Sequence, residues 1–372
     1  MRFLGRTKEL GLLREFYRAK DAPLAVVYGR HRVGKTALVV ASLEGSDIPF
    51  VYLKCRHTSV TRHVSDLMDF AKETFGLPER EVNDQAFADH APVDLEGALW
   101  AIFEEMGKRT GVIVLDDYAV LRDGVPACDE LIRRVLAAHP ETGLKVVLCG
   151  DERVVMTGLL TDNSPLHGLV ALGLAVEPMD YWDAALFYPT FSDDDKVRLY
   201  SVFGGMPFYN SKIDSRLTVK ENIIRLVLAR DALLRDEVTY LLKRAMIKTV
   251  NAERVFEAMA KGATRFSDLY DSSVFSSSPA LADSLKRLVG KGFLKKSIPV
   301  KAANNKKTVR YQFADNLLHF YYRYVEKNRS RLSVWPAEDV WDRFIKGDFE
   351  SEYVPKCFEA IEQSVSVKRD RG

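Results

Sequence analysis

LAVVYGRHRVGKT, residues 24–36, joins a short apolar run to a loop that contains two glycines. The last eight residues fit the pattern GxxxxGK[ST], in which a strand ends in a phosphate-binding loop and a helix begins. Glycine allows backbone angles and a close approach that a Cβ would obstruct, so that successive N–H groups can converge on phosphate oxygens. The segment therefore predicts a cradle for nucleotide phosphates, formed by Gly29, Arg30, His31, Arg32, Val33, Gly34, Lys35 and Thr36.

Two side chains of this loop have the chemistry that a triphosphate and its metal need. Lys35 supplies a compact cation for the β- and γ-phosphate oxygens, and Thr36 offers a hydroxyl to Mg²⁺. The helix that begins here adds its positive end. The alternative is an ordinary glycine-rich turn that happens to carry a lysine. For the variable positions 30–32, we favour solvent-facing charge over a catalytic role.

Acidic residues follow two later apolar runs, as expected if the sheet delivers carboxylates beside the loop. In GVIVLDD, residues 111–117, Asp116 is predicted to hold Mg²⁺ through its water shell, and Asp117 to polarise the attacking water as general base. Capping of a helix is the alternative role for this pair. Asp151 follows KVVLCG, residues 145–150, where it is either a polar sensor near the γ-phosphate or a simple loop aspartate.

The order of apolar runs predicts an α/β fold, with the parallel sheet of a P-loop NTPase core covered by helices. The predicted strands are Leu24–Tyr28, Phe50–Lys54, Val112–Asp116, Lys145–Cys149 and Leu172–Val176. We expect the core to span residues 1–176 and a helical lid to span 177–245. Three short helices and two strands then predict a winged-helix domain at 246–330, with the turn between the strands at Ala303–Lys307. A helical tail, residues 331–372, has too little apolar material for a core of its own.

Bulk composition is that of a folded globular protein, with 47% apolar and 28% charged residues. The four cysteines lie far apart and form no pair with zinc-binding spacing, which suits a reducing compartment. The N-terminus lacks the apolar core of a signal peptide, and no run of about 18 apolar residues occurs. We therefore expect a cytoplasmic protein with no membrane partner.

Charge is unevenly distributed along the chain. Residues 286–331 contain thirteen Lys or Arg and two acidic residues, although the net charge of the whole chain is only +2. Such a basic segment is attractive to duplex DNA, and binding of that kind would be steeply dependent on salt. The alternatives are a solvated wing, which we favour, and a module that contacts proteins. Phe320, Tyr321, Tyr322 and Tyr324 are predicted to form helix core and not a base-stacking platform.

Taken together, these segments resemble the archaeal-type P-loop ATPases, which are related to AAA+ proteins and to the signalling NTPases called STAND. The resemblance includes the opening FLGRTKEL, residues 3–10, SPLHG at 164–168, GGMP at 204–207 and the late segment Tyr311–Tyr324. It implies ATP and Mg²⁺ as cofactors. It also implies that Arg6 and Pro207 help to frame the base.

Several departures from the family pattern bear on activity. The family usually has Asp-Glu where this chain has Asp116-Asp117, so the base is one methylene shorter and slow hydrolysis is expected. Leu169 stands where the family commonly has an arginine, so no arginine finger can be assigned there. Lys356–Glu359 resembles the start of a nuclease-like domain, and we expect the rest of that domain to be absent. Glu359 is therefore expected to be a helix-surface carboxylate.

Three hypotheses follow for the function. The first is a slow ATPase that acts as a nucleotide-driven switch, coupled to the winged-helix module and to a protein partner. The second is a DNA-binding regulator, or a defence or mobile-element protein, whose nucleotide site is mainly structural. The third is an ATPase that works only as an assembled ring, with the arginine supplied by a neighbouring copy.

Overall fold

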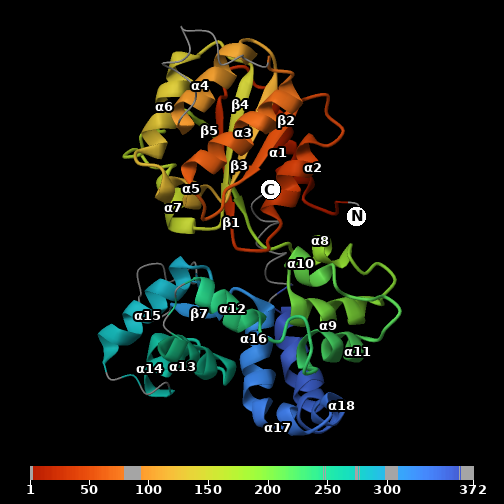
Figure 1. Ribbon diagram of the computed structural model, residues 1–372. Helices are drawn as coiled ribbons and strands as arrows, with labels where there is room; N and C mark the ends of the chain where they lie inside the picture. The colour runs from red at the N-terminus through yellow and green to blue at the C-terminus, as the bar shows by residue number, and fades with distance from the viewer. Residues whose placement is uncertain are drawn as a thin grey trace. The chain divides into compact units, whose positions relative to one another are not determined.

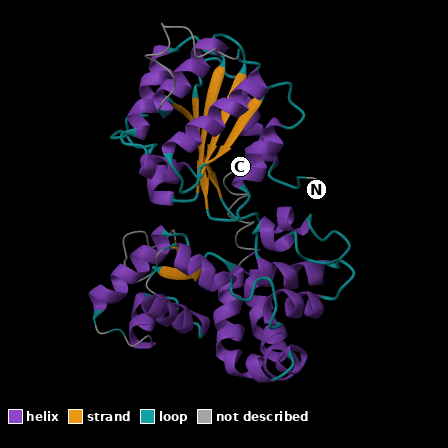
Figure 2. Cartoon of the chain, viewed as in Figure 1, coloured by secondary structure: helices purple, strands orange, loops and turns teal. Residues whose placement is uncertain are grey.

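The computed structural model describes residues 3–78, 94–245, 247, 249–272, 275, 277–297, 309–359 and 361. Contacts divide the chain into two compact units, residues 1–177 and 178–372. Figure 1 traces the elements of both units, and Figure 2 shows that strands dominate the centre of the first whereas the second is mainly helical. Within the described ranges, no helix has the length and apolar character needed to cross a membrane.

The first unit is built on a five-stranded parallel sheet with the order β2-β3-β4-β1-β5. All five predicted strands are confirmed, each to within two residues. They are β1 (Leu24–Gly29), β2 (Phe50–Lys54), β3 (Gly111–Asp116), β4 (Leu144–Gly150) and β5 (Val170–Val176). β3 and β4 are buried along their whole length, which is why they are continuous runs of Val, Ile and Leu.

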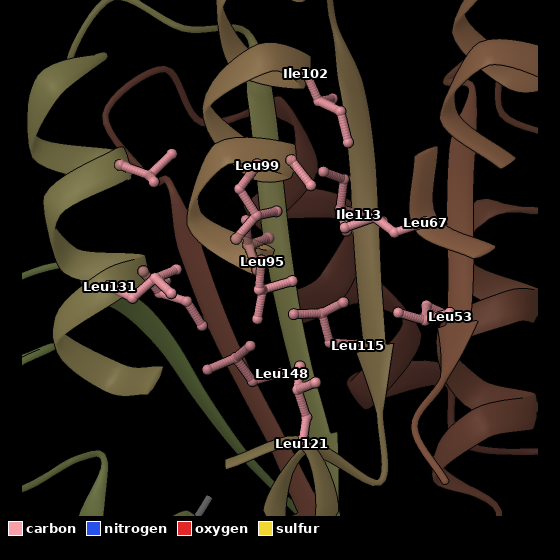
Figure 3. Close-up of a cluster of buried hydrophobic side chains, with 14 of the residues drawn as sticks. Leu53, Leu67, Leu95, Leu99, Ile102, Ile113, Leu115, Leu121, Leu131 and Leu148 are labelled. Atoms are coloured by element: carbon pink, nitrogen blue, oxygen red, sulfur yellow. The ribbon is translucent and has the colours of Figure 1, made fainter. Parts of the chain in front are cut away.

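Helices cover both faces of this sheet. α3 (Val60–Phe75), α4 (Leu95–Met106), α5 (Tyr118–Gly124), α6 (Cys128–Ala138) and α7 (Arg153–Gly158) contribute to one core. In it, Leu95, Leu99 and Ile102 of α4 pack toward the sheet, as Figure 3 shows. α1 (Thr7–Arg18) and α2 (Lys35–Leu43) pack against the other face, which receives the alternate side chains of β1. Because all five strands are parallel, their carboxyl ends lie at the same edge of the sheet, where α2 begins.

The second unit opens with the helices expected for residues 177–245. They are α8 (Tyr181–Ala185), α9 (Asp193–Phe203), α10 (Pro207–Asn210), α11 (Val219–Ile223) with the π-helical turn Ile224–Leu228, and α12 (Glu237–Arg244). A capping box at Thr218 and Glu221 starts α11, and the Ser192 hydroxyl caps α9. The assignment of these helices as a lid stays a prediction.

Three helices and a small antiparallel sheet follow in the predicted order. They are α13 (Thr249–Ala260), α14 (Phe266–Ser272), α15 (Ser278–Gly290), β6 (Leu294–Ser297) and β7 (Arg310–Phe313). The predicted turn at 303–307 lies outside the described residues. Phe256 of α13 packs on Phe293 and Phe313, so that the helices and the sheet share one core. A winged helix fits this order of elements and remains our prediction for their fold.

The C-terminal helices join the rest of the second unit through buried aromatic residues. α16 (Asn316–Phe320) continues as a π-helical turn (Tyr321–Val325), the 3₁₀ turn Glu326–Asn328 and α17 (Arg329–Val334). α18 (Ala337–Val340) runs into the π-helical turn Trp341–Ile345, then α19 (Lys346–Asp348) and the turn Phe349–Tyr353. The predicted aromatic core is confirmed, because Phe320, Tyr321, Tyr322 and Tyr324 are at most 5% exposed.

The tail is predicted to have too little apolar material for a core of its own. The tail shares the core of its own unit: Trp341, Phe349 and Tyr353 are buried, and the Tyr353 hydroxyl donates to the carbonyl of Ser201 in α9 at 3.0 Å. Local patterns could not predict this packing, because Tyr353 and Ser201 are 152 residues apart along the chain. Glu359 is exposed, as expected.

Candidate functional site

The loop between β1 and α2 owes its shape to three positions. Gly34 lies in the left-handed region (φ 92°) just before α2, and Arg32 adopts φ 63°. Gly29 is needed for a different reason from the one predicted. Its φ is ordinary, but a Cβ there would lie 2.2 Å from the carbonyl oxygen of Val176 in the neighbouring β5. The close approach of β5 therefore selects glycine at the end of β1.

Lys35 is the first residue of α2, and its side chain folds back over the loop. It is only 7% exposed, and its Nζ donates to the carbonyl oxygens of Gly29 and Arg30, both at 3.1 Å. The ammonium group is thus held beside the converging backbone of the loop by neutral acceptors. An anion entering the loop would meet a cation whose hydrogen-bond partners are neutral carbonyl groups.

Thr36 and Asp116 lie together, as the sequence predicted, although 80 residues separate them. The Thr36 hydroxyl donates to Oδ2 of Asp116 at 2.7 Å, and the backbone N–H of Asp117 donates to Oδ1 at 3.0 Å. Asp116 is 3% exposed at the end of β3. Both oxygens of the carboxylate are therefore oriented by hydrogen bonds.

Tyr52 of β2 was missed at the sequence level. Its hydroxyl donates to the same Asp116 Oδ2 at 2.6 Å, and burial together with this bond raises the pKa of the phenol. The register that brings them together pairs Lys54 of β2 with Asp116 of β3. Nothing in the sequence specifies that register, so a tyrosine in an apolar run looked like ordinary core.

Asp117 begins α5 in the left-handed region (φ 56°), and its carboxylate makes no capping hydrogen bond to that helix. The alternative role as a side-chain cap is therefore wrong for Asp117. Its Oδ2 lies 3.8 Å from Nζ of Lys54, a second β2 residue that the sequence analysis did not single out. The side chain is 24% exposed, so it is open to water at the edge of the sheet.

Asp151 follows β4 and faces the phosphate loop through His31. The Nδ1 atom of His31 is 3.3 Å from Oδ2 of Asp151, and the two side chains are 31% and 14% exposed. Arg30, His31 and Arg32 are partly buried, and their assignment as solvent-facing charge without a catalytic role stays a prediction. His31 and Asp151 therefore form a polar pair at the end of β4, the strand that lies between β1 and β3.

Arg6 joins the loop to the end of the first unit. It is 3% exposed, and its Nη2 donates to the carbonyl oxygens of Val33 and Glu177, both at 2.9 Å, while Nη1 pairs with Glu9 at 3.2 Å. Pro207 is the first residue of α10 in the second unit. The roles of Arg6 and Pro207 beside the base stay predictions.

The donors at this edge suit Mg²⁺. Mg²⁺ prefers hard oxygen ligands and usually keeps several waters, so it needs only one or two protein oxygens besides the phosphates. The Thr36 hydroxyl and the Asp116 carboxylate are such oxygens. Within the described residues, no group of three or more His, Cys, Asp or Glu side chains could form a metal cage. Thr36 and Asp116 therefore suit a Mg²⁺ ion that a bound phosphate group would also coordinate.

Comparisons with known proteins agree with this geometry. Over 373 aligned residues, the chain is 24% identical to an uncharacterised protein of Methanocaldococcus jannaschii, covering 99% of this chain and 78% of the relative. A Walker-type ATPase of Pyrococcus abyssi has the same fold, with a TM-score of 0.62 at 18% identity, covering 86% of this chain and 96% of the other.

The ORC2 protein of Aeropyrum pernix, solved in ADPNP and ADP complexes, gives a TM-score of 0.51 at 14% identity, covering 88% of this chain and 95% of the other. A family model described as an ATPase domain predominantly from Archaea matches residues 3–213, which is more than half of the chain. The chain therefore belongs to this archaeal ATPase family, as its loop and strand-end acids had suggested.

Proposed function

We propose that this P-loop ATPase-family protein binds ATP together with Mg²⁺ and hydrolyses it slowly. The observation that carries the proposal is the 2.7 Å hydrogen bond between Thr36 and Asp116, which joins the phosphate loop to the acid of β3. Lys35, the next residue along the loop, is held within the same cradle. The ADPNP and ADP complexes of the similarly folded ORC2 protein support a nucleotide as the ligand.

Each residue has a part in this proposal. The backbone of the loop and the Lys35 ammonium bind the phosphates, and Thr36 with Asp116 would hold Mg²⁺. The metal, when bound, neutralises charge on the phosphate oxygens. Asp117 accepts a proton from the attacking water, and Asp151 acts as the sensor, in contact with His31 of the loop.

Two features favour low basal turnover. Lys54 lies within ion-pair distance of Asp117, and this contact competes with the attacking water for the carboxylate. Aspartate also reaches one methylene less far than the glutamate that the family usually has. We expect hydrolysis to accelerate only when something displaces Lys54.

The switch hypothesis gains support from Arg6. One guanidinium nitrogen bonds both to Val33 in the phosphate loop and to Glu177, the last residue of the first unit. A change in loop geometry with nucleotide state would therefore act on the junction with the second unit. Such coupling requires two conformations of the chain. It also requires that the difference in binding free energy between these conformations is not the same for ATP as for ADP.

The first experiment measures ATP binding by calorimetry with Mg²⁺, and steady-state turnover, for the wild-type chain and for Lys35→Ala. Loss of binding in Lys35→Ala, with unchanged circular dichroism, is the expected result. Lys108→Ala, an exposed lysine on the same unit, is the control. No affinity of the wild type for ATP would overturn the proposal.

The second experiment tests the switch by small-angle scattering of the wild-type chain and of Arg6→Ala with ADPNP and with ADP. Different scattering profiles for the two nucleotides in the wild type, and a smaller difference in Arg6→Ala, are expected. Identical wild-type profiles would exclude the switch while leaving nucleotide binding intact.

A second candidate function, DNA binding, is favoured by one observation. Lys295, Lys296 and Arg310 are all exposed on the small sheet β6–β7, where they present positive charge to solvent. Mobility shifts with duplex DNA over a salt series test this candidate, because neutralisation of phosphates makes affinity fall steeply with salt. Replacement of all three by glutamine should abolish the shift if this sheet is the contact.

A further inference from the structure

A group of exposed aromatic and arginine side chains lies near the end of the second unit. It is formed by residues from α17, the connection to α18 and the π-helical turn after it. Val334, Trp335 and Phe344 are 74%, 39% and 39% exposed. Single exposed apolar residues are common on protein surfaces, but adjacent ones mark interaction sites more often. We name this group the aromatic–arginine cluster: Arg331, Val334, Trp335, Arg343 and Phe344.

The four large side chains of the cluster form an ordered stack. The ring centroids of Trp335 and Phe344 are 5.7 Å apart with an interplanar angle of 38°. The guanidinium carbon of Arg331 lies 4.3 Å from the Phe344 centroid, and that of Arg343 lies 5.4 Å from the Trp335 centroid. Each ring therefore carries a cation on it, at distances typical of cation–π contacts.

The backbone beneath the cluster is firmly anchored. Leu332, Trp341 and Ile345 are at most 3% exposed and point into the core of the unit. Arg230, more than 100 residues earlier, donates to the carbonyl oxygen of Ser333. The exposed side chains are thus displayed from a rigid support, which lowers the entropy cost of binding a partner.

The guanidinium groups retain hydrogen-bonding capacity. Arg331 donates to the Asn328 side chain at 2.9 Å, and no carboxylate of the described residues lies within ion-pair distance of Arg331 or Arg343. The nearby Asp342 is already paired with Lys220 at 2.9 Å. Two arginines held in place by rings, and without acidic partners, are well suited to bind carboxylates from another molecule.

We propose that the aromatic–arginine cluster is a docking surface for a protein segment in which an apolar side chain is flanked by carboxylates. Val334 and the edges of the two rings receive the apolar side chain, and the two guanidinium groups bind the acids. Trp and Arg are the residue types that contribute most to binding energy at protein interfaces. This inference does not depend on nucleotide binding by the first unit.

Charge and geometry favour a protein segment over single-stranded nucleic acid. Bases stack on open aromatic faces, whereas here arginines already lie on both rings. Exposed Glu338 and Asp339 in the adjoining α18 would also repel a phosphate backbone. A peptide can direct its acids to the arginines and still avoid these two carboxylates.

The test uses the full chain and three fluorescein-labelled probes: a short peptide with a Trp-Leu pair flanked by glutamates, the same peptide with lysines in place of the glutamates, and oligo-dT. The proteins are the wild type, Trp335→Ser/Phe344→Ser, Arg331→Glu/Arg343→Glu, and the control Trp182→Ser, which removes a 65% exposed tryptophan elsewhere on the same unit. Circular dichroism verifies the fold of each variant, and fluorescence anisotropy reports binding.

We expect the acidic peptide to bind the wild type and Trp182→Ser equally, and each cluster variant at least about tenfold more weakly, which corresponds to about 1.4 kcal/mol. Equal affinity for the acidic and basic peptides, or unchanged binding to the cluster variants, would overturn the proposal. Binding of oligo-dT that is lost in the cluster variants would assign the surface to nucleic acid. Self-association of the wild type that disappears in Trp335→Ser/Phe344→Ser would assign it to a second copy.

Discussion

Removal of one hydroxyl group, in Tyr52→Phe, should raise the Mg²⁺ concentration that ATP binding requires, without unfolding the first unit. The Tyr52 oxygen is 2.6 Å from Asp116 Oδ2, and the Thr36 hydroxyl binds the same carboxylate oxygen at 2.7 Å. Phenylalanine keeps the ring and its packing in β2. Asp116 would then be held by the Thr36 hydroxyl and the Asp117 N–H alone.

The magnitude follows from the kind of bond that is lost. A hydrogen bond to a charged group contributes about 1.5–3 kcal/mol. The Thr36 hydroxyl would have to orient Asp116 while also serving Mg²⁺, so much of this energy should appear in metal binding. Loss of partners that orient metal-binding residues typically costs about 10–100-fold in affinity. We expect the Mg²⁺ concentration that half-saturates ATP binding to rise at least about tenfold.

The assay is a Mg²⁺ titration at fixed ATP, followed by calorimetry, with binding in EDTA as the baseline. Tyr17→Phe is the matched control, since it removes another buried tyrosine hydroxyl of the same unit, hydrogen-bonded to Ser42 at 3.0 Å and away from Asp116. The control should titrate like the wild type. An unchanged Mg²⁺ midpoint in Tyr52→Phe would refute the idea that β2 orients the acid of β3.

Three further predictions concern other contacts. Lys54→Gln should raise ATP turnover by up to about fivefold, because an exposed ion pair is worth at most about 1 kcal/mol. The control Lys108→Gln, which removes another exposed ion pair, should leave turnover unchanged. Equal turnover rates for the wild type and both variants would show that Lys54 does not slow hydrolysis. Gly29→Ala should lower the free energy of unfolding by about 1–3 kcal/mol and impair nucleotide binding, because the added Cβ would collide with the Val176 carbonyl oxygen. The control Gly11→Ala has open space around the added Cβ, so its thermal melt should resemble that of the wild type. Burial lowers the pKa of His319 in the folded chain to about 3, from its ordinary value of 6.5. Between pH 6.5 and pH 3 the imidazole is therefore protonated in the unfolded chain but not in the folded one. The free energy of unfolding should fall as the pH drops through this range. Melting curves of His319→Phe should show a shallower loss over this range than the wild type or than His167→Phe, an exposed control; parallel curves would contradict the assignment.

Local sequence was sufficient to find the strands of the first unit, because each contains a short apolar run, and the central strands β3 and β4 are buried along their whole length. Each strand of the sheet lies where those runs predicted it. Contacts at long range were inferred correctly where a motif implied them, as for Thr36 and Asp116.

The partners of the candidate site needed the tertiary structure. Sheet order and register place Tyr52 and Lys54 of β2 beside the acids of β3, and neither quantity leaves a local signature in FVYLK, residues 50–54. Two further contacts also left no local signature in the sequence. The carbonyl group of Val176 confines Gly29, and the buried Tyr353 donates a hydrogen bond to Ser201, which lies 152 positions earlier.

The residues by themselves determined the P-loop motif, an acid at the end of a later strand and a parallel sheet, because backbone chemistry and periodic burial act over short stretches of chain. Folding decided which side chains surround that acid, how Arg6 connects the loop to the end of the first unit, and which aromatic residues remain at the surface of the second. These depend on strand register and helix packing, in which the interacting groups are distant in sequence and meet only when the cores form.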